Sequence, residues 1–242
     1  MAMLHGCAAQ ANKEPSWGLT LLHLDGANGA TAIVDESGKP FTRTGTPVIT
    51  TADSKFGGAS LDFQITGNNR YMISNGAYSN DLVTGLGPLT LECFFKFYAA
   101  TGFTVQGLVG IGSTSAGGCL NLHRGGTYGT KDAICMMNSS INTTFLDSGI
   151  SHADGNWHHV AVCRDTDGLW TMWVDGVRVA TATTVIDFTN QGAAMTLGNV
   201  QPAVNGYSYR GLLDEVRYIN NKAMYSGATI TVPTAPFAYA KP

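Results

Sequence analysis

The chain has 242 residues, 44% of them hydrophobic and only 13% charged, with a formal net charge of −3 at pH 7. A typical soluble domain carries about 25% charged residues, so this composition indicates that partners cover part of the surface. The basic residues are scattered, which argues against nucleic-acid binding. No apolar run approaches the roughly 18 residues of a membrane span, and we expect no membrane insertion.

The two ends of the chain differ from its middle. Residues 1–18 (MAMLHGCAAQANKEPSWG) lack the basic and apolar regions of a secretory signal. We expect them to form an arm, either disordered or docked on a neighbouring subunit. Residues 231–242 (TVPTAPFAYAKP) contain three prolines and are expected to pack extended over the surface, because proline cannot pair in a central strand. Residues 19–230 fit a single all-β domain, since such domains routinely reach this length.

The first part of this domain is rich in turns, and we expect short strands between them. A turn cluster at residues 37–40 (SGKP) separates two of these strands. Another turn, at residues 66–68, is expected to join the last two strands as a pair. The expected strands are residues 20–24, 32–35, 47–50, 59–63 and 70–73, followed by a polar, glycine-rich loop at residues 75–88.

Residues 89–98 (LTLECFFKFY) predict a long strand with two different faces. One face is wholly apolar and should lie on the core. The opposite face mixes charged and aromatic side chains, as a half-open concave surface would. The apolar set is Leu89, Leu91, Cys93, Phe95 and Phe97, and the mixed set is Thr90, Glu92, Phe94, Lys96 and Tyr98.

The stretch GNWHHVAVCRDTDGLWTMWVDGVRVA organises the rest of the chain. It predicts three antiparallel strands, at residues 157–164, 169–174 and 177–179, joined by two tight turns. Gly168 can supply the positive φ that the first turn needs. Asp175-Gly176 between apolar runs is the strongest short-range signal for a type I′ hairpin.

The remaining elements complete an all-β architecture. No ten-residue stretch has helical periodicity, apart from a single turn expected at residues 222–226. About a dozen short strands with closely spaced turns favour two packed antiparallel sheets. The further strands expected are residues 108–111, 119–123, 133–137, 194–198 and 210–219.

The cysteines and histidines form no metal or redox motif. There are five cysteines and no C-x-x-C pair, so we expect free thiols. A bridge between Cys119 and Cys135 is the alternative, if their strands are neighbours. His158 and His159 are adjacent on a strand, where neighbouring side chains point to opposite faces, so they cannot chelate one ion.

Three blocks of the sequence resemble the laminin-G-like jelly rolls of the concanavalin A-like superfamily, of the kind found in bacteriophage tail and virion proteins. One is the central stretch G-x-W-H-H-V-A-V-x-R-D…W-x-M-W-V-D-G. The others are LLHLDG at residues 21–26 followed by SKFGGASL at 54–61, and GLLDEVRY at 211–218 followed by AMYS at 223–226. The resemblance implies a concanavalin A-like (laminin-G-like) jelly-roll β-sandwich of two antiparallel sheets.

The resemblance extends to enzymes, but their acidic residues are missing here. Retaining glucanases of this superfamily carry a strand motif E-x-D-x-x-E, which places a nucleophile and an acid/base on one face. Asp214 and Glu215 are adjacent, so we expect them to face opposite ways on a strand. Glu92 has no acidic partner two or four residues on. We therefore expect no enzymatic activity.

Calcium is the one cofactor that the resemblance implies. Many concanavalin A-like sandwiches hold a structural Ca²⁺ near the point where the first and last strands meet, bound by carboxylates and backbone carbonyls. The matching positions are Asp214 in LLDEV and Asp25 in HLDG, with carbonyls from Gly57 or Gly58. The alternative is that Asp214 simply hydrogen-bonds a neighbouring turn.

Aromatic side chains suggest where a sugar would bind. A lectin stacks the apolar face of a sugar ring on an exposed aromatic side chain, and amides or carboxylates take the hydroxyls. Here the expected aromatic residues are Trp173 and Tyr98, with polar contacts from Asn121, Arg124 and Tyr128. The alternative is that the aromatic residues pack inside the fold or against another subunit.

The resemblance implies a function without catalysis. We expect a virion protein, from a phage tail, fibre or capsid decoration, that binds glycans or other host-surface ligands as a lectin-like adhesion module. Its partners would be other virion proteins, copies of itself and host-surface glycan, and it would be assembled into the virion in the bacterial host cytoplasm. The alternatives are a purely structural building block and an accessory module of a carbohydrate-active enzyme.

Overall fold

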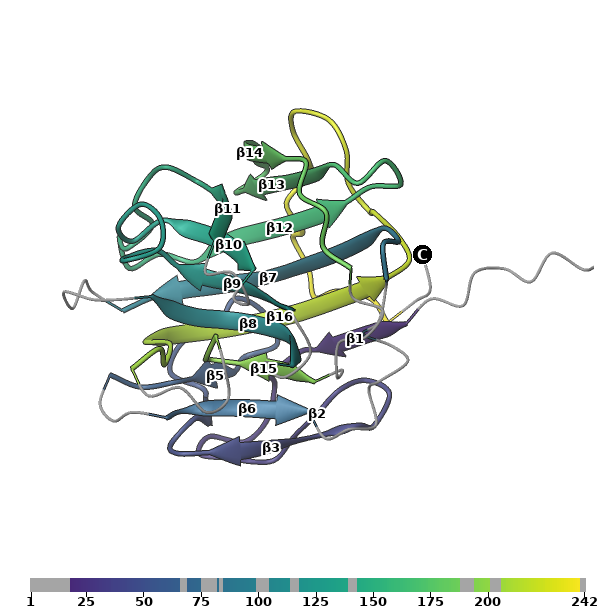
Figure 1. Cartoon of the computed structure of the whole chain (residues 1–242). Helices are drawn as coiled ribbons and strands as arrows, with labels where there is room; N and C mark the ends of the chain where they lie inside the picture. The colour runs from purple at the N-terminus through teal and green to yellow at the C-terminus, as the bar shows by residue number, and fades with distance from the viewer. Residues whose placement is uncertain are drawn as a thin grey trace, which may run out of the picture.

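The computed structural model describes residues 18–65, 69–74, 82, 85–98, 105–113, 118–138, 143–187, 194–200 and 206–239, with the backbone alone at 113, 118 and 119. The described residues form two eight-stranded antiparallel sheets that pack face to face (Figure 1). This confirms the predicted all-β sandwich of two antiparallel sheets. Of the predicted arm at residues 1–18, residues 1–17 lie outside the described residues.

Sheet A carries most of the long strands. Its order is β14 (Val177–Ala182), β13 (Trp170–Val174), β12 (His158–Arg164), β7 (Leu89–Phe97), β16 (Gly211–Asn220), β5 (Ser60–Asp62) and β4 (Val48–Thr50), with β1 (Leu19–Leu22) also paired to β16.

Sheet B lies opposite and brings together strands from all parts of the chain. Its order is β11 (Thr143–Asp147), β10 (Ile134–Asn138), β9 (Gly118–Arg124), β8 (Gln106–Ser113), β15 (Met195–Leu197), β6 (Tyr71–Ser74), β3 (Pro40–Thr44) and β2 (Ile33–Val34).

The core lies between the two sheets and follows from the alternation of apolar residues along the strands. On β7 all five residues of the predicted apolar face are buried in the main hydrophobic cluster. β12, β13 and β14 are the three predicted antiparallel strands joined by tight turns, and we call them the meander. Its second turn has positive φ at both central residues, 48° at Asp175 and 84° at Gly176, as a type I′ hairpin requires.

Two expectations about pairing and local structure are wrong. β5 and β6 do not form a hairpin, because β5 pairs with β16 in sheet A while β6 pairs with β3 and β15 in sheet B. No helical turn forms at residues 222–226. There the hydroxyl of Thr90 donates to the carbonyl of Lys222 at 2.8 Å and accepts the amide of Met224 at 2.9 Å, which holds the chain irregular along β7.

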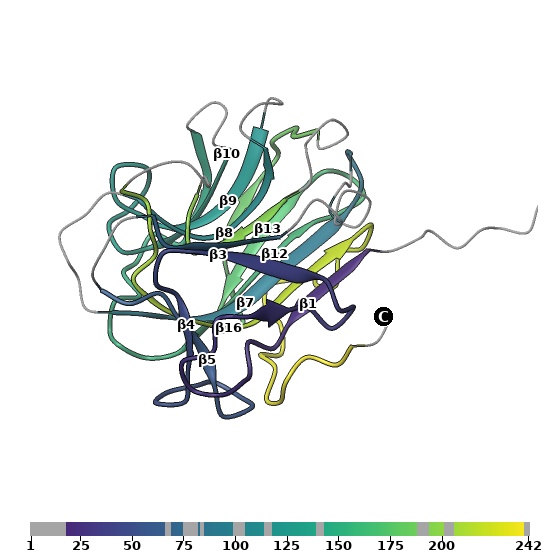
Figure 2. The ribbon, with the colours of Figure 1, turned by 90° about the horizontal axis from the view of Figure 1, so that it is seen from below.

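The outer face of sheet A is covered by residues 222–239, which we call the C-terminal cover. Figure 2 shows this segment, in yellow, on the side of sheet A away from sheet B. Phe237 packs on Phe94, and Tyr225 and Ile230 pack on Trp173. The predicted half-open face of β7 is therefore wrong for Thr90, Glu92 and Phe94, which are buried, because the chain returns over this face after β16.

The outer face of sheet B is also covered, where glycines allow it. Backbone from residues 199 and 200 lies directly on β8. A Cβ atom added at Gly107 would come within 2.1 Å of the amide nitrogen of Val200. Glycine is required at this position because the backbone of residues 199 and 200 occupies the space that a side chain would need.

Two remaining predictions concern thiols and membranes. The thiols of Cys93, Cys135 and Cys163 are free, so the alternative of a bridge between Cys119 and Cys135 is not formed. Among the residues that the structure describes, no helix is long and apolar enough to cross a membrane.

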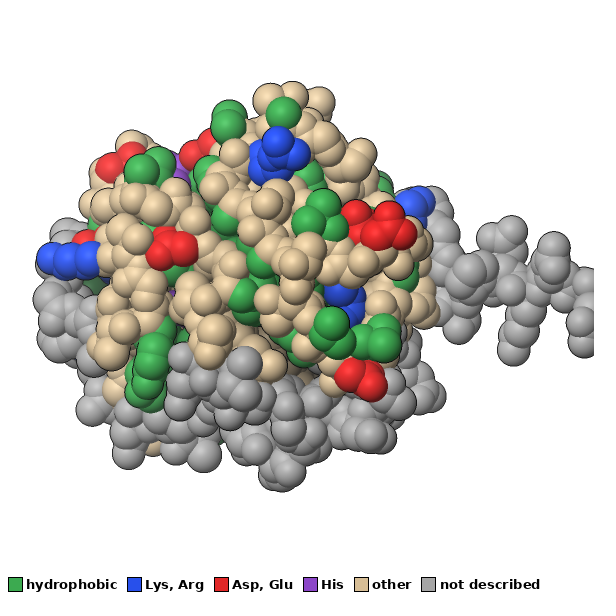
Figure 3. All heavy atoms as spheres, turned by 45° about the horizontal axis from the view of Figure 1, so that its top comes forward, with side chains coloured by type: hydrophobic (Ala, Val, Ile, Leu, Met, Phe, Trp, Pro, Cys, Tyr) green, Lys and Arg blue, Asp and Glu red, His purple; other side chains and the backbone are tan. Residues whose placement is uncertain are grey.

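On the face shown in Figure 3, charged side chains are scattered among polar and hydrophobic ones.

Candidate functional site

Asp214 and Glu215 lie on the same face of β16, contrary to the prediction from strand alternation. The residues on either side of them, Leu213 and Val216, both belong to the core. The register of β16 against β7 shifts between Asp214 and Arg217, and Glu215 has a φ of 50°. A β-bulge of this kind inserts one extra residue, so two consecutive carboxylates point outward together.

The Asp214 carboxylate is held by the backbone but is not neutralised. Its Oδ2 accepts the amide of Lys55 at 2.7 Å and that of Phe56 at 3.1 Å. Its Oδ1 is buried and has no hydrogen-bond partner among the residues that the structure describes. Burial, reinforced by the nearby carboxylates of Glu215 and Asp25, raises the pKa of Asp214 to about 7. Buried polar atoms nearly always have a hydrogen-bond partner, so this oxygen requires an explanation.

Glu215, by contrast, is fully used by the fold. Its Oε2 accepts the amide of Phe237 at 2.8 Å, and its Oε1 lies 2.8 Å from Nδ1 of His23. This carboxylate therefore joins the segment after β1 to the C-terminal cover, and each of its oxygens has a hydrogen-bond partner.

Asp25 lies in an exposed loop beside the loop at residues 53–58. A Cβ atom at Gly57 would fall 2.0 Å from Oδ2 of Asp25, so the carboxylate occupies the space above this glycine. The described residues contain no group of three or more His, Cys, Asp or Glu side chains placed to hold a metal ion. A cation here would use the carboxylates of Asp25 and Asp214 with backbone oxygens, and the idle Oδ1 of Asp214 suits a hard ion such as Ca²⁺.

Glu92, the acidic residue in the middle of β7, is sealed inside an ionic cluster. Its Oε1 accepts Nε and Nη2 of Arg217 at 2.8 and 2.6 Å. Its Oε2 lies 2.9 Å from the hydroxyl of Tyr225 and 3.2 Å from Nε2 of His159. Burial alone would raise its pKa, but the hydrogen bond from His159 and the charge of Arg217 hold the pKa of Glu92 below the usual value. Both oxygens are occupied, and no substrate reaches them.

The two histidines of the meander point to opposite faces, as predicted. His159 faces Glu92 under the C-terminal cover. His158 lies near the surface, with Nδ1 2.6 Å from Oδ2 of Asp175 and Nε2 3.0 Å from Oδ1 of Asp154.

Trp173 is not an exposed sugar platform, so that prediction is wrong. It is 1% exposed, and its indole Nε1 donates to the carbonyl of Gly227 at 3.2 Å. The physical reason is the C-terminal cover, which packs Tyr225 and Ile230 against this indole.

The other predicted ligand residues lie away from Trp173. Asn121 is on β9, buried on the outer side of sheet B. Arg124 is also buried, with Nε 2.8 Å from Oδ1 of Asp132 and Nη1 3.3 Å from the carbonyl of Tyr98. Tyr128 is half-buried and its carbonyl accepts Nε2 of His123 at 2.9 Å. The structure brings Arg124 and Tyr98 together but does not join them to Trp173.

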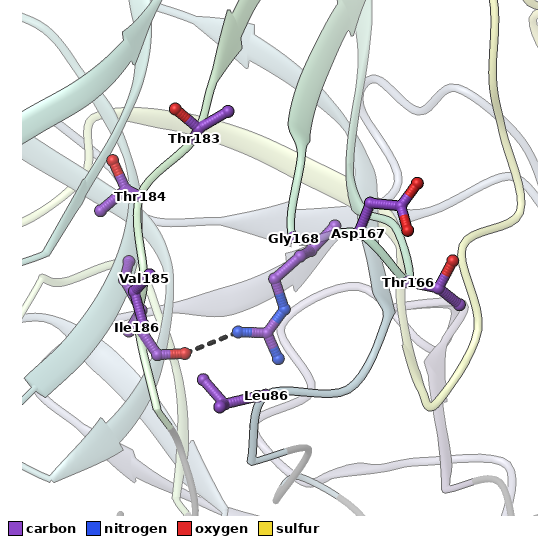
Figure 4. A pocket seen from close by; sticks show the side chains of 9 residues that line it. Leu86, Thr166, Asp167, Gly168, Thr183, Thr184, Val185 and Ile186 are labelled. Atoms are coloured by element: carbon purple, nitrogen blue, oxygen red, sulfur yellow. Dashed lines mark hydrogen bonds between the residues drawn. The ribbon is translucent and has the colours of Figure 1, made fainter.

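A cleft that the sequence did not indicate lies at the tip of the β12–β13 hairpin (Figure 4). Its volume is about 260 Å³. Three segments form its walls: the turn between β12 and β13, the chain after β14 and the loop before β7. The lining residues are Leu86, Arg164, Thr166, Asp167, Gly168, Thr183, Thr184, Val185 and Ile186.

Arg164 fixes the walls of this cleft. Its Nη1 donates to the carbonyl of Ile186 at 2.6 Å, the bond drawn in Figure 4, and its Nε to the carbonyl of Gly87 at 2.8 Å. Its Nη2 reaches the carbonyl of Gly85 at 2.9 Å. The guanidinium therefore joins two loops that are far apart in the sequence. No local motif predicts this, because all three acceptors are backbone carbonyls.

Comparison with protein families identifies a family for this chain. Residues 66–224 match the Laminin_G_3 family, described as the concanavalin A-like lectin/glucanases superfamily. The chain belongs to this family. The matched segment includes the meander, the cleft and Asp214, whereas Asp25 lies before it. A comparison with curated proteins found no match.

Solved structures similar to this Laminin_G_3 chain include one domain of an arabinanase and the binding domains of two other proteins. Domain 4 of AbnA, a GH43 extracellular arabinanase from Geobacillus stearothermophilus, solved in complex with arabinotriose, has a TM-score of 0.60 at 18% identity, over 85% of this chain and 93% of that domain. The binding domain of Paraclostridial Mosquitocidal Protein 1 has a TM-score of 0.60 at 11% identity, over 86% of this chain and 50% of that one. The botulinum neurotoxin serotype G binding domain has a TM-score of 0.56 at 9% identity, over 85% and 48%. At these identities the likeness shows a common fold.

Proposed function

We propose that this Laminin_G_3 domain is a non-catalytic, lectin-like module that binds carbohydrate. One observation carries the proposal. The family includes lectins and glucanases, and in this chain the acidic residue in the middle of β7 is buried and closed off from substrate. Glu92 is buried, paired with Arg217 and covered by Tyr225. A glycoside hydrolase needs two carboxyl groups that reach the scissile bond. Binding without hydrolysis is the function of the family that this arrangement supports.

The proposal includes a place for the module, on the virion of a bacteriophage. The support is the resemblance of the N-terminal and C-terminal sequence blocks to phage tail and virion modules, together with the low fraction of charged residues, 13%. Partners would be other virion proteins, copies of the same chain and a glycan of the host surface. Many copies on one particle would convert weak single sites into firm attachment.

We also propose a structural Ca²⁺ held by Asp25 and Asp214. The idle, buried Oδ1 of Asp214 and the raised pKa of this carboxyl support it. The ion would neutralise the two carboxylates where the loop after β1 meets β16. The alternative role for Asp214, accepting the amides of Lys55 and Phe56, is compatible with an ion on the other oxygen.

The test is binding of the purified full chain to an array of bacterial surface polysaccharides, with calcium and again with a chelator. Binding in either condition, without release of reducing sugar, is the expected result. A stable oligomer that binds no polysaccharide would overturn the hypothesis of a lectin-like module and favour a structural building block. Release of reducing sugar from a bound polysaccharide would overturn the non-catalytic part.

A further inference from the structure

We propose that the cleft between the β12–β13 turn and residues 183–186 is the sugar site, and that it takes a neutral sugar residue and rejects acidic ones. This inference rests on the proposed function and adds a location and a ligand class to it. It differs from the site expected on Trp173 and Tyr98, because that site is covered or dispersed.

The size of the cleft suits a single sugar unit. Sites for drug-sized ligands usually enclose about 300–1,000 Å³. At about 260 Å³, this cleft would take one ring of a longer chain and leave the rest in solvent.

The polar groups of the cleft are those that hydroxyl groups prefer. Thr166 and Thr183 are exposed, Thr184 is half-buried, and all three line the cleft. A hydroxyl both donates and accepts, so each threonine can pair with a sugar hydroxyl in either direction. The exposed carboxylate of Asp167 can accept from two neighbouring sugar hydroxyls, a charge-assisted contact stronger than a neutral one.

Two apolar side chains offer a surface for the C–H face of a sugar ring. Leu86 is 60% exposed and Val185 is 85% exposed, and both line the cleft. Covering such side chains removes apolar area from water at about 25 cal/mol per Å². Hydroxyl partners on one wall and apolar side chains on another match the two sides of a sugar ring.

The charges around the cleft argue against an anionic ligand. The positive group, Arg164, is buried, with its donors directed at backbone carbonyls. The exposed charges among the described neighbours are the carboxylates of Asp167 and Asp187. A uronic or sialic acid would meet like charge here, which costs binding energy.

The walls of the cleft are held in place before binding, and a tryptophan beside it can report binding by its fluorescence. The Arg164 guanidinium lies 5.2 Å from the ring centre of Trp170, and the indole Nε1 of Trp170 donates to the carbonyl of Thr184 at 2.9 Å. Walls that are fixed before binding lose little conformational entropy. Because Trp170 is bonded to a lining residue, a bound sugar should change its fluorescence.

The experiment titrates the full chain with neutral polysaccharides (mannan, β-glucan, galactan and arabinan) and with acidic ones (polygalacturonate and colominic acid). Binding is followed calorimetrically and by tryptophan fluorescence. The test variant is Val185→Asp. The matched control is Val34→Asp, because Val34 is 58% exposed and lies on β2 at the far edge of sheet B. Unchanged thermal melting of both variants checks the fold.

We expect a neutral polysaccharide to bind with a fluorescence change, Val185→Asp to weaken it about tenfold or more, and Val34→Asp to leave it unchanged. Equal binding by wild type and Val185→Asp would place the glycan elsewhere and overturn this inference, while the carbohydrate-binding function stands. A preference for the acidic polysaccharides would overturn the ligand class in the same way. Binding to none of the six would overturn the proposed function and this inference together.

Discussion

The hydroxyl of Tyr225 donates to Oε2 of Glu92 at 2.9 Å, which joins the C-terminal cover to the central strand of sheet A. Glu92 also accepts two hydrogen bonds from Arg217, the ion pair that crosses from β7 to β16. The same contact that seals Glu92 from solvent thus fastens the cover.

Tyr225→Phe removes this contact and keeps the ring. We expect a loss of about 1–2 kcal/mol in the free energy of unfolding, since the buried carboxylate loses one of its donors. Urea unfolding measures it. Tyr239→Phe is the control, because Tyr239 is 51% exposed, and it should change nothing. Equal stability of wild type and Tyr225→Phe would contradict a fastening role for this hydroxyl.

His158 should make stability depend on pH. Both ring nitrogens lie within hydrogen-bond distance of a carboxylate, and only the imidazolium carries two N–H groups. The hydrogen bond to Asp175, aided by that to Asp154 and opposed by burial, raises the pKa of His158. The stabilisation is therefore complete below the unfolded pKa and is lost as pH rises through the higher folded pKa.

The measurement is the free energy of unfolding of wild type and His158→Gln from about pH 5 to 9. We expect wild type to be more stable by about 1 kcal/mol at the acid end, and the difference to shrink as pH rises. His152, whose ring centre is 5.2 Å away, remains in both proteins. A difference that stays constant across the range would show that the charge of His158 adds nothing.

Asp214→Asn should change stability in opposite directions with and without calcium. In a chelator the folded state holds a carboxyl whose pKa is about 7, so wild type loses stability as pH rises from the unfolded pKa to about 7. Asparagine removes this cost while its carbonyl still accepts the two amides. We expect the variant to be more stable than wild type at pH 8 by about 1–3 kcal/mol.

With excess calcium the order should reverse, because a bound ion stabilises the folded wild type and the variant lacks one ligand. Thermal melting with chelator, calcium and magnesium checks both parts. Identical melting of wild type in chelator and in calcium would reject the proposed ion site.

Gly198→Ala should be among the most damaging single changes in the sandwich. Gly198 has a φ of 83°, and a Cβ atom there would lie 1.9 Å from Cε1 of the buried Phe63. Strain at positive φ and overpacking add, so we expect a loss of about 3 kcal/mol or more. Gly149→Ala has a similar φ of 72° with open space around it and measures the strain alone. If both variants lost the same free energy of unfolding, the ring of Phe63 would move aside without destabilising the fold.

The sequence predicted the sandwich because its strongest signals are local. Asp175-Gly176 can form few structures other than a hairpin, and the alternation on β7 identifies its inner face correctly. The bulge at Glu215 escaped prediction, since no residue type there demands a positive φ. That single inserted residue reversed the expected direction of one carboxylate.

The candidate site was harder to predict because segments distant in the sequence determine which outward-facing side chains are exposed. Strand alternation predicts that Trp173 and Phe94 face outward, and they do. They are buried by long-range packing: Tyr225 and Ile230 pack on Trp173, and Phe56 and Phe237 pack on Phe94. The cleft depends on carbonyls bonded to Arg164, and backbone acceptors leave no trace in residue identity. Such features follow from long-range packing rather than from local propensity.

The position of β16 has a consequence for how the protein is made. It is the last described strand in the chain, yet in sheet A it lies between β7 and β5 and also pairs with β1. During translation those three strands wait without their common neighbour until residues 211–220 leave the ribosome. Sheet A therefore cannot close co-translationally from its N-terminal end, and a nascent chain stalled before β16 would expose apolar strands to aggregation.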